Sequence, residues 1–375
     1  MRIAFYAPLK PPDHPIPSGD RRVAQLFLAA LRMAGHDTRI ASRFRSYDGQ
    51  GDPLRQARVA SIGARLAARF VRRCREAPQT APELWFTYHL YHKAPDWLGP
   101  QIADVLRIPY VVAEASDAPK QASRGWAAGR RAAERAIRRA DAVIGLNPAD
   151  RECVLPFLQE PRRWVAFKPF IDADFYAGQA RARAGPPRLV AIAMMRYGDK
   201  LASYQLLGGA LWRLLDLPWS LEVIGDGPAR RDVEGALYPL GERVTWAGEI
   251  GPIEVARRLA SADLCVWPAL NEAFGMALLE AQASGVPVVA GAAGGVREIV
   301  AHGITGLLAP PGDGPAFALA VSSLLVDHPR RAAFAEAARH RVRAEHDISS
   351  AARRLNTVFD AVSPRSRRNR EPTNS

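Results

Sequence analysis

Two carboxylates flank a short apolar segment in the stretch NEAFGMALLEAQASGVPVVA, which spans residues 271–290. Glu272 and Glu280 lie eight positions apart, and the segment ends at Gly285. If residues 274–284 form a helix, eight positions correspond to a rise of about 12 Å. The paired carboxyl groups of glycoside hydrolases lie roughly 5 to 9.5 Å apart. The spacing therefore suits two contacts on one extended ligand better than acid and base catalysis at one bond.

The same stretch contains a helix start that could receive an anion. Asn271 or Glu272 can cap the expected helix, and the first amides of a helix point outward, where phosphates bind in many proteins. The amides concerned are those of Phe274, Gly275, Met276 and Ala277. Because an acidic side chain would repel a bare phosphate, a neutral polyol such as a sugar fits better between them. Taken alone, the pattern favours the simpler alternative of a capped helix with an exposed Glu280.

The elements that must position these residues are short β-branched segments alternating with longer helical patterns. In the first half, strands are expected at residues 2–7, 37–42, 83–88, 109–114, 141–146 and 164–169. In the second half, they are expected at 188–195, 219–225, 243–248, 262–268, 286–291 and 305–310. This alternation predicts an α/β fold with two tandem Rossmann-like, doubly wound parallel-sheet domains that face a cleft. Ligands bind such domains beyond the carboxyl ends of the strands.

The expected domain organisation follows from these elements. An N-terminal domain covers residues 1–175, and the Pro- and Gly-rich segment 176–187 links it to a C-terminal domain over residues 188–346. A last helix over residues 347–363 is expected to return to the N-terminal domain. The tail 364–375 is polar and basic without an apolar anchor, so we expect it to be disordered.

Composition narrows the class of protein. The 375 residues carry a net charge of +13 at pH 7, which calls for an anionic partner or reflects only an arginine-rich composition. No apolar run is long enough to span a bilayer, and the chain opens on an expected strand, so a cytoplasmic location is expected. The three cysteines are widely spaced, which argues against a disulfide framework or a structural zinc site.

Several motifs, in this order, resemble the donor-binding region of retaining GT-B-fold glycosyltransferases of family 4. The family's E-x7-E pair corresponds to Glu272 and Glu280. The other matching segments are MMRYGDK at 194–200, VIGDGP at 223–228, WAGEI at 246–250, GVPVVAG at 285–291 and GGVREIVAHGITGLLAPPGD at 294–313. The resemblance is good over residues 188–346 and weaker in the N-terminal half.

This resemblance implies an activity. A sugar would pass from a nucleotide-diphospho-sugar, held by the C-terminal domain, to a hydroxyl of a glycan, a lipid-linked molecule or a small molecule on the N-terminal side. The anomeric configuration would be retained. Neither a metal nor another cofactor is expected, and the setting would be cell-envelope or polysaccharide biosynthesis.

The resemblance also assigns roles to individual residues. Glu272 would hold hydroxyls of the transferred sugar, Glu280 the ribose hydroxyls, and the helix-end amides the sugar or the β-phosphate. Departure of a nucleoside diphosphate builds negative charge, which needs a metal or cations. Arg196 and Lys200 would supply the cations, since no Asp-x-Asp motif stands where a metal would be needed. The residues expected to line the nucleotide pocket are Gly225 and Ile250.

The N-terminal half matches the family at one loop. Gly19 corresponds to a family glycine that touches the donor phosphate and the acceptor, and Arg22 is a candidate phosphate contact. The alternative is that Ser18-Gly19-Asp20 serves only as a helix cap.

One departure from the family concerns catalysis. A histidine is usual just after the fourth expected strand, but this chain has Glu114, Ala115 and Ser116 there. His89 and His92, at the end of the preceding strand, would face one side if that segment were helical. Zinc binding by this pair is not expected without a third ligand. The departure leaves two alternatives open, a non-catalytic relative that binds a nucleotide-sugar and a nucleotide-sugar epimerase of the same fold.

Residues 55–75 combine arginines with apolar side chains at helical spacing. The arginines are Arg55, Arg58, Arg65, Arg69, Arg72, Arg73 and Arg75, with Leu66, Phe70 and Val71 between them. One interpretation is a basic helix lying on the anionic inner face of a membrane. The other, slightly favoured, is a helix packed on the sheet with a solvated basic face. Nucleic-acid binding is not expected, because no recognition motif accompanies the charge.

Overall fold

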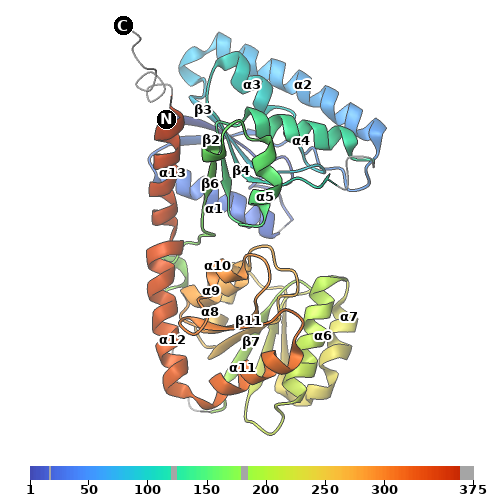
Figure 1. The fold of residues 1–375 in the computed structure, drawn as a ribbon, viewed down its shortest axis with the longest axis vertical. Coiled ribbons are helices and arrows are strands. Elements are labelled where there is room, and N and C mark those ends of the chain that lie inside the picture. The colour runs from blue at the N-terminus through green and yellow to red at the C-terminus, as the bar shows by residue number, and fades with distance from the viewer. Residues whose placement is uncertain (17, 120–124, 179–184, 364–375) are drawn as a thin grey trace. The chain divides into compact units, whose positions relative to one another are not determined.

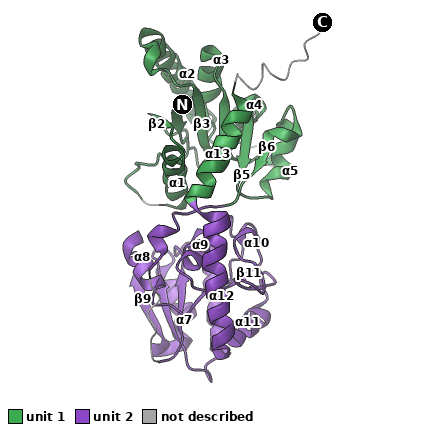
Figure 2. Ribbon diagram, turned by 90° about the vertical axis from the view of Figure 1, so that its left-hand side faces the viewer, with its two compact units in different colours: residues 1–168, 348–375 green, residues 169–347 purple. Residues whose placement is uncertain are grey.

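The computed structural model describes residues 1–16, 18–119, 125–178 and 185–363, which form two compact units (Figures 1 and 2). Unit 1 comprises Met1–Lys168 and Ile348–Ser375, and unit 2 comprises Pro169–Asp347. Each unit contains a six-stranded sheet in which every strand pair is parallel. The expected α/β class with two Rossmann-like domains is confirmed.

The sheet of unit 1 has the order β2-β1-β3-β4-β5-β6. Its strands are β1 (Arg2–Tyr6), β2 (Asp37–Ser42), β3 (Leu84–Leu90), β4 (Tyr110–Ala115), β5 (Ala142–Gly145) and β6 (Trp164–Ala166). Its helices are α1 (Gly19–Met33), α2 (Pro53–Glu76), α3 (Gly99–Leu106), α4 (Ala127–Arg139), α5 (Asp150–Val154) and α13 (Ile348–Val362). Strands β4 and β5 are buried along their whole length, as expected for parallel strands covered by helices on both faces.

Two helical layers cover this sheet. Helices α2, α3 and α4 contact one another on one face, and α1 packs against α13. Strand side chains alternate between the faces, so Phe86 and its neighbours meet the second layer. There Phe86 lies 5.5 Å from Phe27 of α1 and 6.2 Å from Phe359 of α13, measured between ring centroids. These aromatic contacts hold the C-terminal helix in unit 1, whereas the tail 364–375 lies outside the described residues.

The sheet of unit 2 has the order β12-β11-β10-β7-β8-β9. Its strands are β7 (Arg188–Ile192), β8 (Ser220–Ile224), β9 (Val244–Gly248), β10 (Leu264–Trp267), β11 (Val288–Gly291) and β12 (Gly306–Ala309). Its helices are α6 (Asp199–Trp212), α7 (Arg230–Leu237), α8 (Pro252–Leu259), α9 (Met276–Ala283), α10 (Val296–Ile299), α11 (Gly314–Val326) and α12 (His328–Arg341). Because the chain enters at β7 and the strand order reverses there, the switch point lies between β7 and β10.

The two units divide after Lys168, before the segment 176–187 that composition suggests as a linker. Ile171 and Tyr176 are buried in the core of unit 2, and Ile171 forms a parallel bridge with Asp347. Burial of these side chains explains why the segment after Lys168 belongs to unit 2. Residues 179–184 of the expected linker lie outside the described residues.

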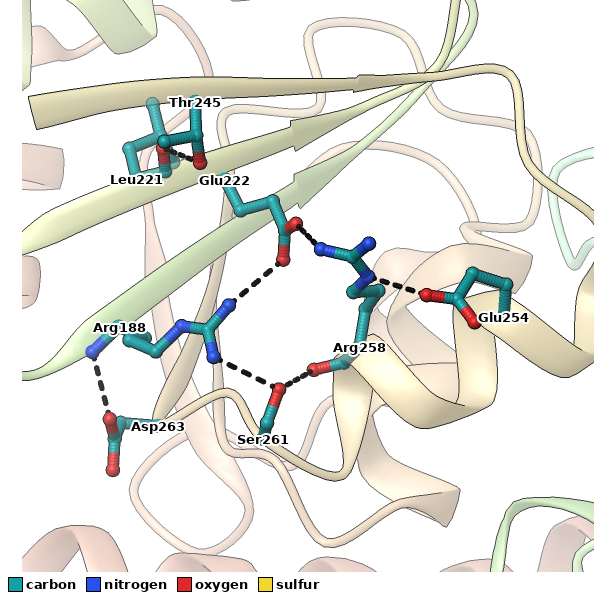
Figure 3. A network of polar contacts seen from close by, with 8 residues as sticks. All are labelled: Arg188, Leu221, Glu222, Thr245, Glu254, Arg258, Ser261 and Asp263. Carbon is teal, nitrogen blue, oxygen red and sulfur yellow. Dashed lines mark hydrogen bonds and ion pairs between the residues drawn. The ribbon is translucent and has the colours of Figure 1, made fainter. Parts of the chain in front are cut away.

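A buried ion-pair network joins β7, β8 and α8 in the amino-terminal part of the unit 2 sheet (Figure 3). The Glu222 carboxylate accepts hydrogen bonds from Arg188 Nη2 at 3.3 Å and from Arg258 Nη1 at 2.6 Å. Arg258 Nε also donates to Glu254 Oε1 at 2.7 Å, and Arg188 Nη1 donates to the Ser261 hydroxyl at 3.2 Å. Since a buried carboxylate is tolerated only when it is paired and hydrogen-bonded, we assign this network a structural role.

Replacement of Glu222 should destabilise unit 2. We expect Glu222→Ala to lower the free energy of unfolding by roughly 2–3 kcal/mol, because two guanidinium groups lose their shared acceptor. Urea denaturation measures this loss. The control is Glu336→Ala, whose side chain is 79% exposed and should change stability by less than about 0.5 kcal/mol. Equal losses in the two variants would contradict the assignment.

Candidate functional site

Two glycines let the loops after β7 and β8 pack backbone against backbone. Gly225 and Gly227 have φ angles of +138° and +154°, which L side chains rarely adopt. A Cβ atom on Gly225 would lie 2.0 Å from the Ala193 carbonyl oxygen, and one on Gly227 would lie 2.3 Å from that of Met195. These contacts place the VIGDGP turn directly beside the loop that carries Arg196. A role for Gly225 in nucleotide binding stays a prediction.

The loop after β10 is tied to the first turn of α6. The Asn271 side chain donates to Asp199 Oδ2 at 2.8 Å, and the Leu270 amide donates to the Ser203 hydroxyl at 3.2 Å. These bonds cross the switch point between β7 and β10, and they bring two predicted site residues together, Lys200 and Glu272.

Lys200 and Glu272 form an ion pair to which a tryptophan contributes. Lys200 Nζ contacts Glu272 Oε2 and lies 5.3 Å from the centroid of the Trp267 ring. The Trp267 indole N–H donates to the same oxygen, Glu272 Oε2, at 3.2 Å. The sequence motifs include both charged residues but not Trp267. Its only signal is its position at the end of an expected strand, five residues before Glu272.

Arg196 lies in the loop after β7, four residues before Lys200 of α6, and its side chain is exposed. Its carbonyl oxygen accepts a hydrogen bond from the Leu201 amide at 3.0 Å. The loop therefore presents Arg196 to solvent, while Lys200 in the first turn of α6 pairs with Glu272.

Helix α9 begins later than expected. Gly275, at φ +74°, is the residue before it, and among the described residues no side chain caps it. The expected capping by Asn271 or Glu272 is wrong, because Asp199 engages the first side chain and Lys200 and Trp267 engage the second.

Of the four amides expected at the helix start, those of Met276 and Ala277 lie in the first turn, while Phe274 and Gly275 precede it.

The glycine pair 294–295 packs against the chain that carries Glu272. A Cβ atom on Gly294 would lie 2.1 Å from the Glu272 carbonyl oxygen, and one on Gly295 would lie 2.3 Å from that of Ala273. The Gly295 amide also donates to the Glu272 carbonyl at 3.3 Å. The GG motif therefore supports the backbone on which the first glutamate stands.

Glu280 is half-buried on α9 and not exposed as a simple surface helix predicts. Helix α9 is enclosed on most sides, since its residues at 278, 279, 281, 282 and 283 are all buried. Burial raises the pKa of the Cys265 thiol to about 12, and the negative charge of the nearby Glu280 carboxylate adds to this effect. Ile250 is half-buried and packs against the core of unit 2 after β9. Ribose and nucleotide contacts by Glu280 and Ile250 stay predictions.

Unit 1 holds a second polar cluster at the carboxyl ends of β3 and β4. His89 Nδ1 lies 2.9 Å from Asp20 Oδ1 of α1. His89 and Glu114 have positive φ angles of +57° and +61°, and the pairing of their neighbours, Tyr88 with Ala113, sets them opposite each other. Such φ angles are strained for residues other than glycine and cluster at functional sites.

Burial sets the protonation of this cluster. Glu114 is buried, accepts a hydrogen bond from the Leu146 amide at 2.5 Å, and has its pKa raised by burial to about 8. Burial also raises the pKa of Asp150 to about 6, although His89 opposes this. Burial acts in the same direction on Asp20, but its hydrogen bond to His89 leaves the Asp20 pKa below the ordinary value. At neutral pH the cluster therefore combines a protonated carboxyl with an ionised one.

His92 does not share a side with His89. The segment is not helical, because Tyr91 and Ala94 pair across a tight turn, and the expectation that the two histidines face one side as a helix is wrong. The His92 ring packs edge-on against Trp126, 5.8 Å away between centroids. Burial lowers the pKa of His92 below its ordinary value. We therefore retain only His89 as a candidate site residue.

Gly19 is the first residue of α1, and Ser18 caps this helix. The Ser18 hydroxyl accepts a hydrogen bond from the Arg21 amide at 3.2 Å, which confirms the predicted capping role. Arg22 is half-buried in the first turns of α1. Phosphate contacts by Gly19 and Arg22 stay predictions.

In the part of the chain that the structure describes, no group of three or more His, Cys, Asp or Glu side chains is arranged to hold a metal ion. Within the same residues, no helix has the length and apolar character that crossing a bilayer requires. The three cysteines are free thiols.

Residues 186–327 match the family described as Glycosyl transferases group 1, and this segment contains the Lys200–Glu272 pair. Over these residues, unit 2 is similar to this family. It is 29% identical over 239 residues to alpha-D-kanosaminyltransferase of Streptomyces kanamyceticus, covering 60% of this chain and 62% of the relative. It is 34% identical over 212 residues to D-inositol 3-phosphate glycosyltransferase of Mycobacterium sp. (strain JLS), covering 53% and 46%. The match thus spans less than two thirds of these relatives.

Solved structures of the same fold cover the whole chain. Sucrose-phosphate synthase from Thermosynechococcus elongatus has a TM-score of 0.70 at 22% identity, covering 96% of this chain and 98% of its own. Anabaena Alr3699/HepE, solved in complex with UDP, has a TM-score of 0.71 at 17% identity, covering 96% and 100%. At these identities the likeness shows the fold, which is GT-B.

The buried Glu114 carboxyl should make stability depend on pH. The folded pKa near 8 exceeds the ordinary value of 4.5, so between these pH values the folded state keeps a proton that the unfolded state has lost. The contribution of Glu114 is therefore complete below about pH 4.5 and falls as pH rises toward 8, by at most about 1.4 kcal/mol per pH unit. Glu114→Gln cannot ionise, so its melting temperature relative to wild type should rise from pH 5 to pH 8.

Thermal unfolding of both proteins across this pH range tests the expectation. Titration of Asp20, Tyr88 and Asp150 is common to both proteins and largely cancels in the difference. Glu336→Gln, at an exposed glutamate, serves as the control and should show a flat difference. A flat difference for Glu114→Gln as well would show that Glu114 ionises normally.

Proposed function

We propose that this protein transfers a glycosyl group from a nucleotide-diphospho-sugar to an acceptor hydroxyl, with retention of configuration and without a metal. The observation that carries the proposal is the Lys200–Glu272 pair at the switch point of unit 2, with Arg196 in the loop just before Lys200. The match of residues 186–327 to the glycosyltransferase family supports it, as do the names of the two relatives, a kanosaminyltransferase and an inositol phosphate glycosyltransferase. The UDP complex of HepE supports the choice of donor class.

Charge determines which part of the donor each residue binds. Lys200 and Arg196 bind the diphosphate, and Glu272 accepts hydrogen bonds from hydroxyls of the transferred sugar. The first-turn amides of α9 complete the contact with the sugar or the β-phosphate. Glu280, further along α9, binds the ribose hydroxyls.

The same groups assist the reaction. The bond between C1 of the sugar and the diphosphate oxygen breaks, and the acceptor oxygen bonds to C1 on the same face. The departing diphosphate gains negative charge, which the Lys200 and Arg196 cations stabilise in a site arranged before the reaction. This role of two cations is why we propose transfer without a metal.

Unit 1 supplies the contacts to the acceptor in this proposal. Asp20 and His89 form a pair that can accept a hydrogen bond from a hydroxyl, and Glu114 occupies the position where the family usually has histidine. A protonated Glu114 can also donate a hydrogen bond. The acceptor is accordingly a hydroxyl compound, whether a glycan, a lipid-linked molecule or a small molecule. Transfer is favoured over epimerisation or binding without turnover, because the named relatives are transferases.

Removal of the Lys200 cation should impair transfer more than it impairs folding. We expect Lys200→Ala to lower kcat by roughly 100-fold or more, because one charge facing the leaving group is lost. The donor is first identified by thermal shift with UDP, GDP, ADP and their sugars. Product formation is then followed over an acceptor panel with and without EDTA, and the anomeric configuration of the product is read by NMR.

Arg257→Ala provides the matched control, since its side chain is 75% exposed on α8, outside the site. It should leave kcat unchanged. Full activity of Lys200→Ala, or loss of wild-type activity in EDTA, would refute the proposed cation role. An inverted product would refute retention alone.

We also propose a peripheral contact between α2 and the anionic inner face of a membrane, in a cytoplasmic protein. The seven arginines of residues 55–75 are exposed, whereas Leu66, Phe70 and Val71 pack in the core of unit 1. Because the apolar side chains are already used, the contact is electrostatic and involves no insertion. Each arginine near an anionic surface contributes about 1 kcal/mol.

Sedimentation with vesicles tests this contact. Wild type should bind vesicles containing phosphatidylglycerol at low salt and dissociate at about 0.5 M salt, because surface charges are then screened. Substitution of Arg58, Arg65, Arg69 and Arg72 by Gln should abolish binding, while Arg257→Gln should not. Absence of wild-type binding at low salt, or binding that persists in high salt, would refute an electrostatic contact.

A further inference from the structure

Trp267 occupies a fixed position beneath the Lys200–Glu272 pair. It is the last residue of β10, and only 3% of its surface is exposed. Its ring packs edge-on against the Tyr204 ring, 4.9 Å away between centroids. The Tyr204 hydroxyl in turn donates to the Ala193 carbonyl at 2.8 Å. The indole therefore cannot turn away without disturbing α6 and the loop after β7.

The indole N–H and Lys200 share one acceptor. Both contact Glu272 Oε2, the indole N–H at 3.2 Å and Lys200 as an ion pair. Lys200 is 28% exposed and flexible, whereas the indole is buried and rigid. The two donors therefore differ in kind, because one can exchange its partner for a ligand and the other cannot.

Donor binding requires this exchange, if the proposed function is correct. A diphosphate competes with Glu272 for Lys200, since each is an anion that pairs with the same ammonium group. When Lys200 leaves, the half-buried Glu272 carboxylate loses one of its hydrogen-bond donors and needs another. Trp267 is the only neighbour shown to donate to this carboxylate besides Lys200, within the described residues.

We infer that Trp267 is the positioning residue that keeps Glu272 aimed at the sugar when the donor diphosphate takes Lys200 away. The Lys200–Glu272 pair then acts as a latch in the free protein. The diphosphate end of the donor draws off Lys200, and the sugar hydroxyls replace Lys200 on the carboxylate. The inference rests on the proposed function and extends it. It predicts that the protein binds a sugar diphosphate in preference to the bare diphosphate only when the Trp267 indole N–H is present.

Trp267→Phe isolates that hydrogen bond. Phenylalanine keeps an aromatic ring for Tyr204 and Lys200 but has no N–H group. Isothermal titration of the full chain compares two probes, a nucleoside diphosphate and its glucose ester, for whichever of UDP, GDP and ADP stabilises wild type most. In the complex with the diphosphate alone, water fills the sugar position and hydrates Glu272, so the indole N–H matters little and the Kd should change less than twofold. In the complex with the sugar diphosphate the sugar displaces that water, so the Kd should rise about tenfold when the carboxylate is no longer oriented. A structural defect would weaken both ligands alike and overturn the inference.

A double substitution tests whether Trp267 acts through Glu272. In a Glu272→Ala background, Trp267→Phe should weaken binding of the sugar diphosphate no further, because the carboxylate that it orients is absent. Independent, multiplying losses would overturn the inference. Failure of wild type to bind either probe would instead refute the proposed function, and the inference with it.

Glu272→Gln tests the latch even if Trp267→Phe fails to fold. Glutamine can still accept from the indole N–H but carries no charge to hold Lys200. The freed Lys200 should therefore bind the diphosphate without sugar several-fold more tightly than wild type does, although the contact with the sugar is weakened. Equal or weaker binding of the diphosphate by Glu272→Gln would overturn the latch.

Discussion

Close approach of backbone to backbone at the carboxyl ends of the unit 2 strands is the constraint on which the donor-side site depends. Gly225, Gly227, Gly294 and Gly295 each face a carbonyl oxygen that a Cβ atom would reach at 2.0–2.3 Å. Any side chain at these positions would push the loops apart. These contacts, with the hydrogen bonds from Asn271 and Leu270, hold together the Arg196 loop, the first turn of α6 and the loop with Glu272.

Within this arrangement of loops, charge pairing and hydrogen bonding determine how Glu272 is held. Glu272 is placed between a mobile ammonium group and a fixed indole N–H, so its charge is satisfied before any ligand arrives. Such an arrangement avoids an unpaired carboxylate in the free protein, which would be costly in a half-buried position. Lys200 also stays available to an anion that binds it more tightly than Glu272 does. By contrast, the Glu222 side chain is only 8% exposed and its two arginine partners join the sheet to α8, which suits a structural role.

Unit 1 places two non-glycine residues with positive φ angles at the carboxyl ends of its strands. His89 and Glu114 adopt positive φ angles on neighbouring strands, and Asp20 reaches His89 from α1. The buried Glu114 carboxyl favours its protonated form, while the Asp20 carboxyl favours its ionised form. Two carboxyl groups with different protonation therefore flank one histidine at the strand ends, although the family's usual histidine is replaced.

The sequence by itself determined the elements and the charged candidates, because these follow from local patterns. β-Branched runs predict twelve parallel strands, all found in the two sheets, and Ser18 precedes α1 as a cap must. The tertiary structure alone decided which groups meet. Lys200 and Glu272 are 72 residues apart, and Asp20 and His89 are 69 apart. Their contacts, the role of Trp267 and the late start of α9 depend on how separate elements pack, and local periodicity carries no information about that packing.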